Sequence, residues 1–185
     1  MKPILLLALL SLSASADLVI TEVMPSSGHT TLKGDWWELT NTGTSAVSLD
    51  GYYWNDDDGI TPSYFPSGIS IAPNQSIIIL QDALGTEVGT WKIAWGISAS
   101  TTVLSSFLFP ETIVGSQKFS GLGGTGDSVI LYNPAGTAVA EVKFGTAVLG
   151  RSFVYHEDAT PIYNQTSVNG RNGAYTSSQA DVGSP

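Results

Sequence analysis

The densest group of charged side chains in this sequence is the run at residues 55–59, Asn-Asp-Asp-Asp-Gly. Carboxylates on a tight turn can offer oxygens to calcium, a hard cation that takes about six to eight of them. An EF-hand loop is excluded, because aligning the run with one puts Trp54 at its first ligand position and Phe65 at its last. The alternative is a solvated hairpin turn whose charges discourage strand pairing. No cofactor is required, and the candidate calcium ligands are Asp50, Asp56, Asp57 and Asp58.

Two carboxylates on neighbouring predicted strands, Glu22 and Glu38, could act as the general acid and general base on a sugar substrate. Simple alternation places Glu22 on the same face as Leu18 and Ile20, which predicts a hydrogen-bonded position at the rim of the fold. A structural role for both glutamates is the alternative, and the pattern favours it.

Other catalytic patterns are weak. His29 and His156 lie in predicted loops, and the sequence has neither a G-x-S-x-G nucleophile elbow nor a cysteine. Residues 121–126 match G-x-G-x-x-G, but that motif needs a strand before it and a helix after it to hold a pyrophosphate. Here a strand is predicted to follow. We therefore expect no enzyme, with a weak hydrolase as the residual alternative.

The aromatic side chains indicate a binding surface more strongly. Trp37 alternates with Leu39 and is predicted to be core, whereas Trp36 points the other way beside polar residues. Exposed aromatic rings mark binding sites, and flat rings can stack on sugar faces. The alternative is ordinary packing beneath a helical turn predicted at residues 88–96. The candidate ligand-binding residues are Trp36, Tyr53, Tyr64 and Trp91.

The elements that must position these side chains are β-strands. Residues 17–23 and 36–41 alternate with a period of two, which predicts strands that are buried on one face. Residues 157–185, rich in Ser, Asn and Gly, are predicted to be an irregular segment packed on the same domain. About seven to nine short strands separated by turns favour one all-β sandwich of two sheets. Further strands are predicted at residues 52–55, 76–81, 102–109, 128–133, 138–144 and 152–156.

The first sixteen residues have the features of a secretory signal. Lys2 gives a positive start, residues 4–12 are apolar, and residues 14–16, Ala-Ser-Ala, form a small-x-small cleavage site. The apolar run is shorter than the roughly 20 residues that span a bilayer. We therefore expect cleavage before Asp17 and a secreted protein without membrane insertion, whose main domain is residues 17–156.

The charge balance argues against polyanionic partners. The chain has 16 acids against 7 bases, a net charge of −9, and removal of Lys2 with the signal would make it −10. A protein that binds nucleic acid should carry a basic stripe, which this sequence lacks. The absence of cysteine excludes disulfides and thiolate metal sites, so the core must hold the fold.

Four blocks of the sequence carry a family resemblance. They are residues 18–23, residues 35–41 with 47–52, residues 65–66 with 71–75, and residues 126–133 with 140–142. These blocks resemble the lamin tail domain family in its secreted bacterial branch. The resemblance implies an immunoglobulin-like β-sandwich. In bacteria such domains occur alone or attached to secreted hydrolases, as binding or surface modules.

The combined expectation is a secreted, non-catalytic module that binds or adheres to a cell-surface or extracellular-matrix component. Its expected partner is an extracellular glycan or a surface protein. One alternative is a structural subunit that self-associates through the edges of its sheets. Another is an accessory domain of a secreted hydrolase system. Nucleic acid is not an expected partner.

Overall fold

The computed structural model describes residues 17–28, 34–56, 62–82, 84–109, 121–156, 158–161, 166–171 and 173–185. The predicted signal at residues 1–16 lies outside them. Within the described residues the chain forms thirteen short strands, one α-helix and one 3-10 helix. No helix in this part of the chain is long and apolar enough to cross a membrane.

The described residues form the following elements, in chain order. The strands are β1 (Leu18–Met24), β2 (Trp36–Asn41), β3 (Val47–Ser48), β4 (Tyr53–Asn55), β5 (Ser63–Tyr64), β6 (Ser70–Ile71), β7 (Ser76–Leu80), β8 (Thr102–Ser105), β9 (Asp127–Tyr132), β10 (Ala138–Phe144), β11 (Phe153–Val154), β12 (Tyr175–Thr176) and β13 (Val182–Gly183). The helices are α1 (Val88–Trp95) and the 3-10 helix η1 (Ser106–Leu108).

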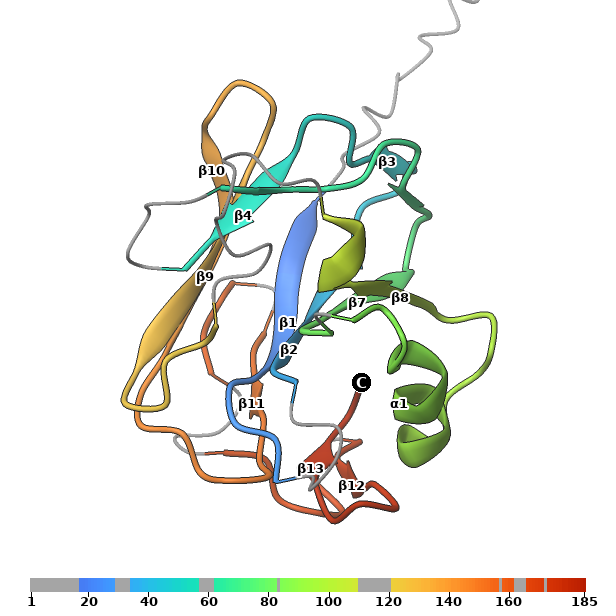
Figure 1. Ribbon diagram of the computed structural model, residues 1–185. Coiled ribbons are helices and arrows are strands. Elements are labelled where there is room, and N and C mark those ends of the chain that lie inside the picture. The colour runs from blue at the N-terminus through green and yellow to red at the C-terminus, as the bar shows by residue number, and fades with distance from the viewer. Residues whose placement is uncertain are drawn as a thin grey trace, which may run out of the picture.

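Two main sheets form a sandwich (Figure 1). The five-stranded sheet has the order β11-β1-β2-β7-β8, and the four-stranded sheet has the order β10-β9-β4-β5. Two strand pairs, β3-β6 and β12-β13, are added to them. The main sheets thus hold nine strands, five and four, and this is the two-sheet sandwich with one short helix that the strand pattern predicts.

The main core lies between these two sheets. Trp37 of β2 is fully buried, and its ring centroid lies 5.3 Å from that of Trp54 in β4 and 6.4 Å from that of Phe65. Trp37 is paired in register with Val23 on one side and Ile79 on the other, and both are fully buried. A period of two therefore sends this row of side chains inward, and the prediction that Trp37 is core is confirmed.

Helix α1 covers the opposite face of the five-stranded sheet. The Asp82 carboxylate accepts hydrogen bonds from the backbone N–H groups of Gly85 and Glu87 at 2.8 and 2.9 Å, which fixes the approach to the helix. Gly96, with a φ of 65°, ends it in the left-handed conformation that glycine tolerates best. A second apolar cluster fills the space beneath the helix, formed by Met24, Trp36, Ile78, Leu80, Trp91, Ala94 and Trp95.

The C-terminal segment closes one end of the five-stranded sheet (Figure 1). The buried Asp181 carboxylate accepts hydrogen bonds from Ser27 Oγ at 2.6 Å and the Gly28 N–H at 2.8 Å. Tyr175 Oη donates to the backbone oxygen of Trp95 at 2.7 Å. The segment that the sequence predicts to be irregular therefore contains the short pair β12-β13. It contacts both α1 and the residues that follow β1.

Candidate functional site

Three tyrosines form a row across the outer face of the four-stranded sheet. Tyr64 of β5 and Tyr132 of β9 each lie directly opposite Tyr53 of β4. Trp54, the next residue in β4, points into the core, so Tyr53 points outward. We call Tyr53, Tyr64 and Tyr132 the tyrosine row.

The sheet itself sets the spacing of these rings. The centroids of Tyr53 and Tyr132 are 4.8 Å apart with planes at 8°, and those of Tyr53 and Tyr64 are 5.0 Å apart with planes at 43°. Neighbouring strands are about 4.8 Å apart, so cross-strand rings stack without distorting the backbone. Tyr64 is 37% exposed and lies on an edge strand, whereas Tyr53 and Tyr132 are half-buried. The row therefore combines apolar ring surface with phenol hydroxyls that both donate and accept hydrogen bonds.

Two of the four predicted ligand-binding residues are not on the surface. Trp36 is fully buried and Trp91 is 3% exposed. Trp36 does point away from Trp37, as the alternation predicts, but α1 covers that face of the sheet. Its ring meets those of Trp91 and Trp95 edge-on, with centroids 5.6 and 5.5 Å apart. The prediction that Trp36 and Trp91 present exposed rings is wrong, because these rings form the second core.

The other two predicted residues, Tyr53 and Tyr64, come together in the tyrosine row. Sequence analysis missed their neighbour Tyr132, although it lies in a predicted strand. Its position in the row depends on the pairing of β4 with β9, which are separated by more than seventy residues. The period-two pattern shows which face a residue occupies and gives no register between distant strands.

The acidic turn lies only partly within the described residues. Asp57 and Asp58 fall outside them. Asp56 is buried, whereas Asp50 is exposed and accepts a hydrogen bond from the Gly68 N–H at 2.7 Å. Among the residues that the structure describes, no three His, Cys, Asp or Glu side chains are grouped to hold a metal ion. Calcium binding by this turn stays a prediction.

Calcium titration tests that prediction. An ion that binds only the folded turn raises the melting temperature by mass action, by about 2.7 kcal/mol of stability at a hundredfold excess over Kd. The hypothesis predicts this rise in the protein and its loss when Asp56→Asn is combined with Asp58→Asn. A melting temperature that stays constant up to millimolar calcium would leave a plain solvated turn.

Glu22, which is buried, and Glu38, which is half-buried, form a polar cluster on the helix-side face of the five-stranded sheet. A β-bulge between Ile20 and Glu22 shifts the register of β1, so Glu22 lies opposite Glu38. The expectation that Glu22 shares a face with Leu18 and Ile20 is therefore wrong, because the bulge adds a residue and turns the side chain over. Glu22 is 1% exposed, so it is not a rim residue either.

Hydroxyl groups surround both carboxylates. Glu22 accepts hydrogen bonds from Ser152 Oγ, and from Ser184 through its N–H at 2.8 Å and its Oγ at 2.9 Å. Glu38 accepts one from Thr21 Oγ1, which lies 2.9 Å from Thr40 Oγ1. Burial raises the pKa of Glu22 to about 7, the hydrogen bond from Ser152 lowers it, and the charge of Glu38 raises it. Burial likewise raises the pKa of Glu38.

The glycine-rich run at residues 121–126 is a loop tied to two carboxylates. Asp127 Oδ2 accepts a hydrogen bond from the Gly123 N–H at 2.6 Å, and Asp35 Oδ2 accepts one from the Leu122 N–H at 3.0 Å. Burial raises the pKa of Asp35 to about 7. Strand β9, and not a helix, follows the run. The backbone N–H groups of Leu122 and Gly123, which a pyrophosphate would need as donors, are bonded to carboxylates instead. Of the two histidines, His29 lies outside the described residues and His156 is exposed.

The sheet order, the core and the family comparison agree on one class of protein. The chain is an immunoglobulin-like β-sandwich with an added helix on one face. The family model for the Lamin Tail Domain matches residues 11–146, well over half of the chain, so the chain belongs to the lamin tail domain family. A comparison with curated proteins returns no match. The residues after 146, which lie outside the family match, supply Ser152 and Ser184 to the Glu22 cluster.

Proposed function

We propose that the protein is a secreted binding module that acts without catalysis, and that the tyrosine row contacts a neutral polysaccharide of the cell surface or extracellular matrix. The observation that carries the proposal is the row itself: three outward rings, held in register by the sheet, with Tyr64 exposed at its edge. Exposed aromatic and apolar surface on a folded protein often marks a binding site.

The chemistry of the row favours a sugar ligand. The outer face of Tyr64 is a flat apolar surface against which the C–H face of a sugar ring can pack, and the phenol hydroxyls match sugar hydroxyls. The net charge of −9 repels uronate and sulfate groups, so a neutral polysaccharide fits better than an acidic one.

The glutamate pair supports a module without catalysis. Glu22 is 1% exposed, and its carboxylate is covered by Ser152 and Ser184. A glycosidase needs both carboxyl groups to reach the scissile bond in an open site. The hydroxyl groups around Glu22 instead join β1 to the C-terminal segment, which is a structural role.

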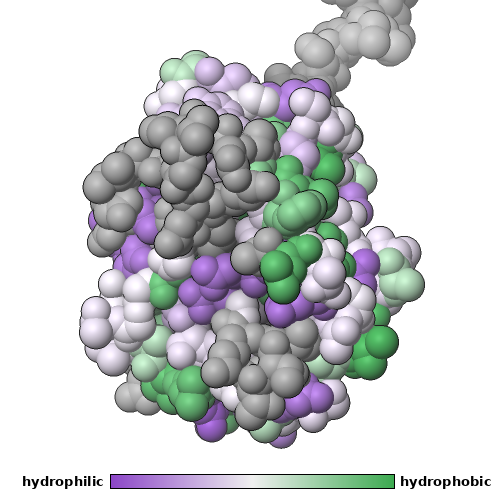
Figure 2. Space-filling model, in the orientation of Figure 1, coloured by the Kyte–Doolittle hydropathy of each residue, from purple (hydrophilic) through white to green (hydrophobic). Residues whose placement is uncertain are grey.

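Substitution of Tyr64 tests the proposed contact. Loss of an exposed aromatic anchor commonly costs about 2 kcal/mol of binding free energy, which is roughly 30-fold in affinity. Tyr64→Ala should therefore weaken retention in affinity electrophoresis through gels that contain neutral polysaccharides. Phe107 is the matched control, because it is an aromatic residue that is 50% exposed at η1. Figure 2 shows hydrophobic residues, in green, gathered where η1 lies in Figure 1. Phe107→Ala should leave retention unchanged, and equal losses in both variants would contradict the proposal.

Two further measurements separate the alternatives. A self-associating subunit would elute from a size-exclusion column as a large species that grows with concentration, whereas the proposed module elutes as a monomer. A hydrolase would release reducing ends from the retained polysaccharide, and the proposed module leaves it intact. Either contrary result would replace the binding module with that alternative.

A further inference from the structure

Strand β5 has few contacts that hold it on the four-stranded sheet. It lies at the edge of that sheet and contains only Ser63 and Tyr64. Among the described residues its strand partner is β4, where Tyr53 lies opposite Tyr64 and Trp54 lies opposite Ser63. The sequence contains no cysteine, so a disulfide cannot fasten this edge. A covalent link here must come from other side chains.

The rings of Tyr53 and Tyr64 lie next to each other across this strand pair. Their centroids are 5.0 Å apart, and their planes meet at 43°. Side chains that lie directly opposite each other on paired strands are held at such a distance by the backbone. The separation is close to that of two phenol rings joined by one carbon–carbon bond. A small rotation of the two rings therefore brings their edges together.

Tyr132 lies on the other side of Tyr53 and has a different geometry. The planes of these two rings meet at 8°, with centroids 4.8 Å apart, so the rings are stacked face to face. A carbon–carbon bond between two phenols joins ring edges, which stacked rings do not present to each other. The stacked ring instead shares the unpaired electron of an oxidised Tyr53. The pair arranged for coupling is therefore Tyr53 with Tyr64.

An oxidant in solution reaches the tyrosine row at Tyr64, which is 37% exposed, whereas Tyr53 and Tyr132 are half-buried. Other tyrosines are placed differently. Tyr155 is 3% exposed, and the ring of Tyr175 meets a tryptophan. Among the residues that the structure describes, ring contacts between two tyrosines occur only within the row. The row thus combines access with a coupling partner.

We propose that Tyr53 and Tyr64 are a site of oxidative cross-linking, where a peroxidase with hydrogen peroxide joins the two side chains as dityrosine and ties β5 to β4. Each phenol gives up one electron and its hydroxyl proton and becomes a phenoxyl radical. The radicals form one bond between ring carbons adjacent to the oxygen-bearing carbons. The hydrogens displaced from these two carbons move to the oxygens and restore both hydroxyls. The protein loses two hydrogens, and one hydrogen peroxide takes them up as two water molecules.

The link closes a loop of the chain at residues 53–64, which contains the acidic run. Closing a loop restricts the unfolded chain, so the linked protein should melt at a higher temperature than the untreated protein. An equal or lower melting temperature would contradict the fastening role. The inference goes beyond the proposed function, because the site can couple whether or not the row contacts a polysaccharide. The proposed secretion matters only in bringing the protein to an extracellular oxidant.

Treatment of the purified protein with a peroxidase and hydrogen peroxide tests the site by mass spectrometry. The monomer should lose two hydrogens. A protease that cleaves before aspartate separates Tyr53 from Tyr64, because residues 56–58 are Asp-Asp-Asp. The expected product is a linked pair of peptides, residues 50–55 and 58–81, with the link on Tyr53 and Tyr64. A link between other tyrosines, a covalent dimer without the internal link, or an unchanged mass would each overturn the proposal.

Two matched variants, Tyr64→Phe and Tyr175→Phe, each remove one phenol hydroxyl and keep the ring. Tyr64→Phe should abolish both the loss of two hydrogens and the rise in melting temperature on treatment. Tyr175→Phe should leave both unchanged, and equal effects in the two variants would contradict the assignment. Tyr64→Phe also keeps the flat apolar face proposed to contact a sugar. A failure to cross-link is therefore distinguishable from a failure to bind polysaccharide.

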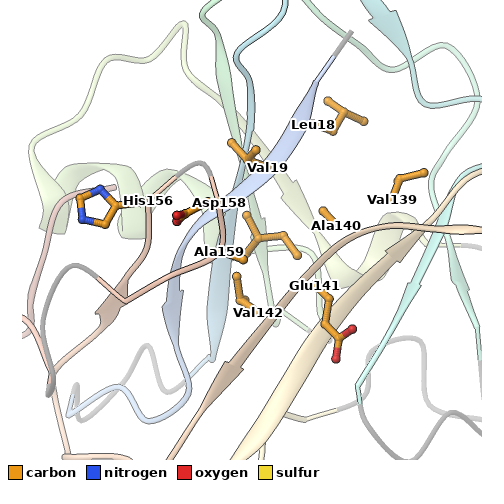
Figure 3. Close-up of a pocket in the computed structure, with 10 residues that line it drawn as sticks. Leu18, Val19, Val139, Ala140, Glu141, Val142, His156, Asp158 and Ala159 are labelled. Atoms are coloured by element: carbon orange, nitrogen blue, oxygen red, sulfur yellow. The ribbon is translucent and has the colours of Figure 1, made fainter.

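Oxidation at other places on the surface is recognised by its mass. His156 is exposed and lines a pocket of about 250 Å³ between β1 and β10, where the described lining residues include no tyrosine (Figure 3). Oxidation of the imidazole adds oxygen, whereas the dityrosine link removes hydrogen. Oxygen added at His156 without the loss of two hydrogens would show that the oxidant reaches the protein and that the row does not couple, which overturns the proposal.

Discussion

Trp36→Ala is expected to lower the free energy of unfolding by about 3–5 kcal/mol, as much as Trp37→Ala, although the two residues point to opposite faces of β2. Trp37 fills the core between the sheets, and Trp36 fills the core beneath α1, where it meets Trp91 and Trp95. Both side chains are fully buried, so each truncation leaves a large cavity. Denaturant melts followed by circular dichroism measure the two losses.

The Trp36 variant should also loosen one element selectively. With its ring removed, α1 loses the contacts of Trp91 and Trp95 with Trp36, so its amides should exchange faster than those of β9. Phe107→Ala is the control, because that ring is half exposed and its loss should cost much less. A loss at Trp36 as small as that at Phe107 would mean that the helix does not cover the sheet.

Stability is expected to fall as pH rises from about 4.5 to 7, and Glu22 is one of the causes. Burial raises the pKa of Glu22 in the folded protein to about 7, from 4.5 in the unfolded chain. Between these values the folded state holds more protons than the unfolded state, so raising the pH favours unfolding. The loss is on the order of 3 kcal/mol for this one carboxyl. The raised pKa values of Glu38 and Asp35 act in the same direction.

Glu22→Gln removes the ionisation and keeps a carbonyl acceptor for Ser152 or Ser184. The expected result is a shallower fall in melting temperature between pH 4 and pH 8, two values that bracket the predicted window. Glu141→Gln is the matched control, because Glu141 is exposed and ion-paired with Lys143 at 3.0 Å. An unchanged slope in Glu22→Gln would show that Glu22 is ionised in the folded state throughout this range.

The direction in which a side chain points could be predicted from the sequence, but its exposure could not. Alternation along β2 correctly separates Trp36 from Trp37. Exposure depends on what else covers the face, and the apolar helix that covers Trp36 lies about fifty residues further along the chain. A tryptophan that points away from one core is therefore as consistent with a second core as with a binding surface.

The sequence pattern also did not predict where a strand ends early or contains a bulge. Residues 102–109 are predicted as one strand, but β8 ends at Ser105 and η1 follows. The reason is local: Ser105 Oγ accepts the Phe107 N–H at 3.1 Å, and Ser106 Oγ accepts the Asp82 N–H at 2.9 Å. Serine side chains thus satisfy backbone groups that a continued strand would have paired. The bulge in β1 has a similar effect on Glu22.

The partners of Glu22 show a third limit. Ser184 lies 162 residues from Glu22 along the chain and within a segment whose composition indicates irregular structure. Composition describes local preference and does not show which distant loop reaches a buried carboxylate. The family resemblance did identify the sandwich, because its strand pattern is shared, whereas the residues after 146 lie outside the matched region.

The measurement that tests the proposed function most directly is glycan-array binding by the protein and by a variant in which Tyr53, Tyr64 and Tyr132 are all replaced by threonine. Threonine favours strands, so the variant should keep the circular dichroism spectrum of the parent. The tyrosine row predicts that the parent binds neutral polysaccharides and that the variant, still folded, does not. Binding that survives in the variant, or a parent that binds no glycan with or without calcium, would contradict it.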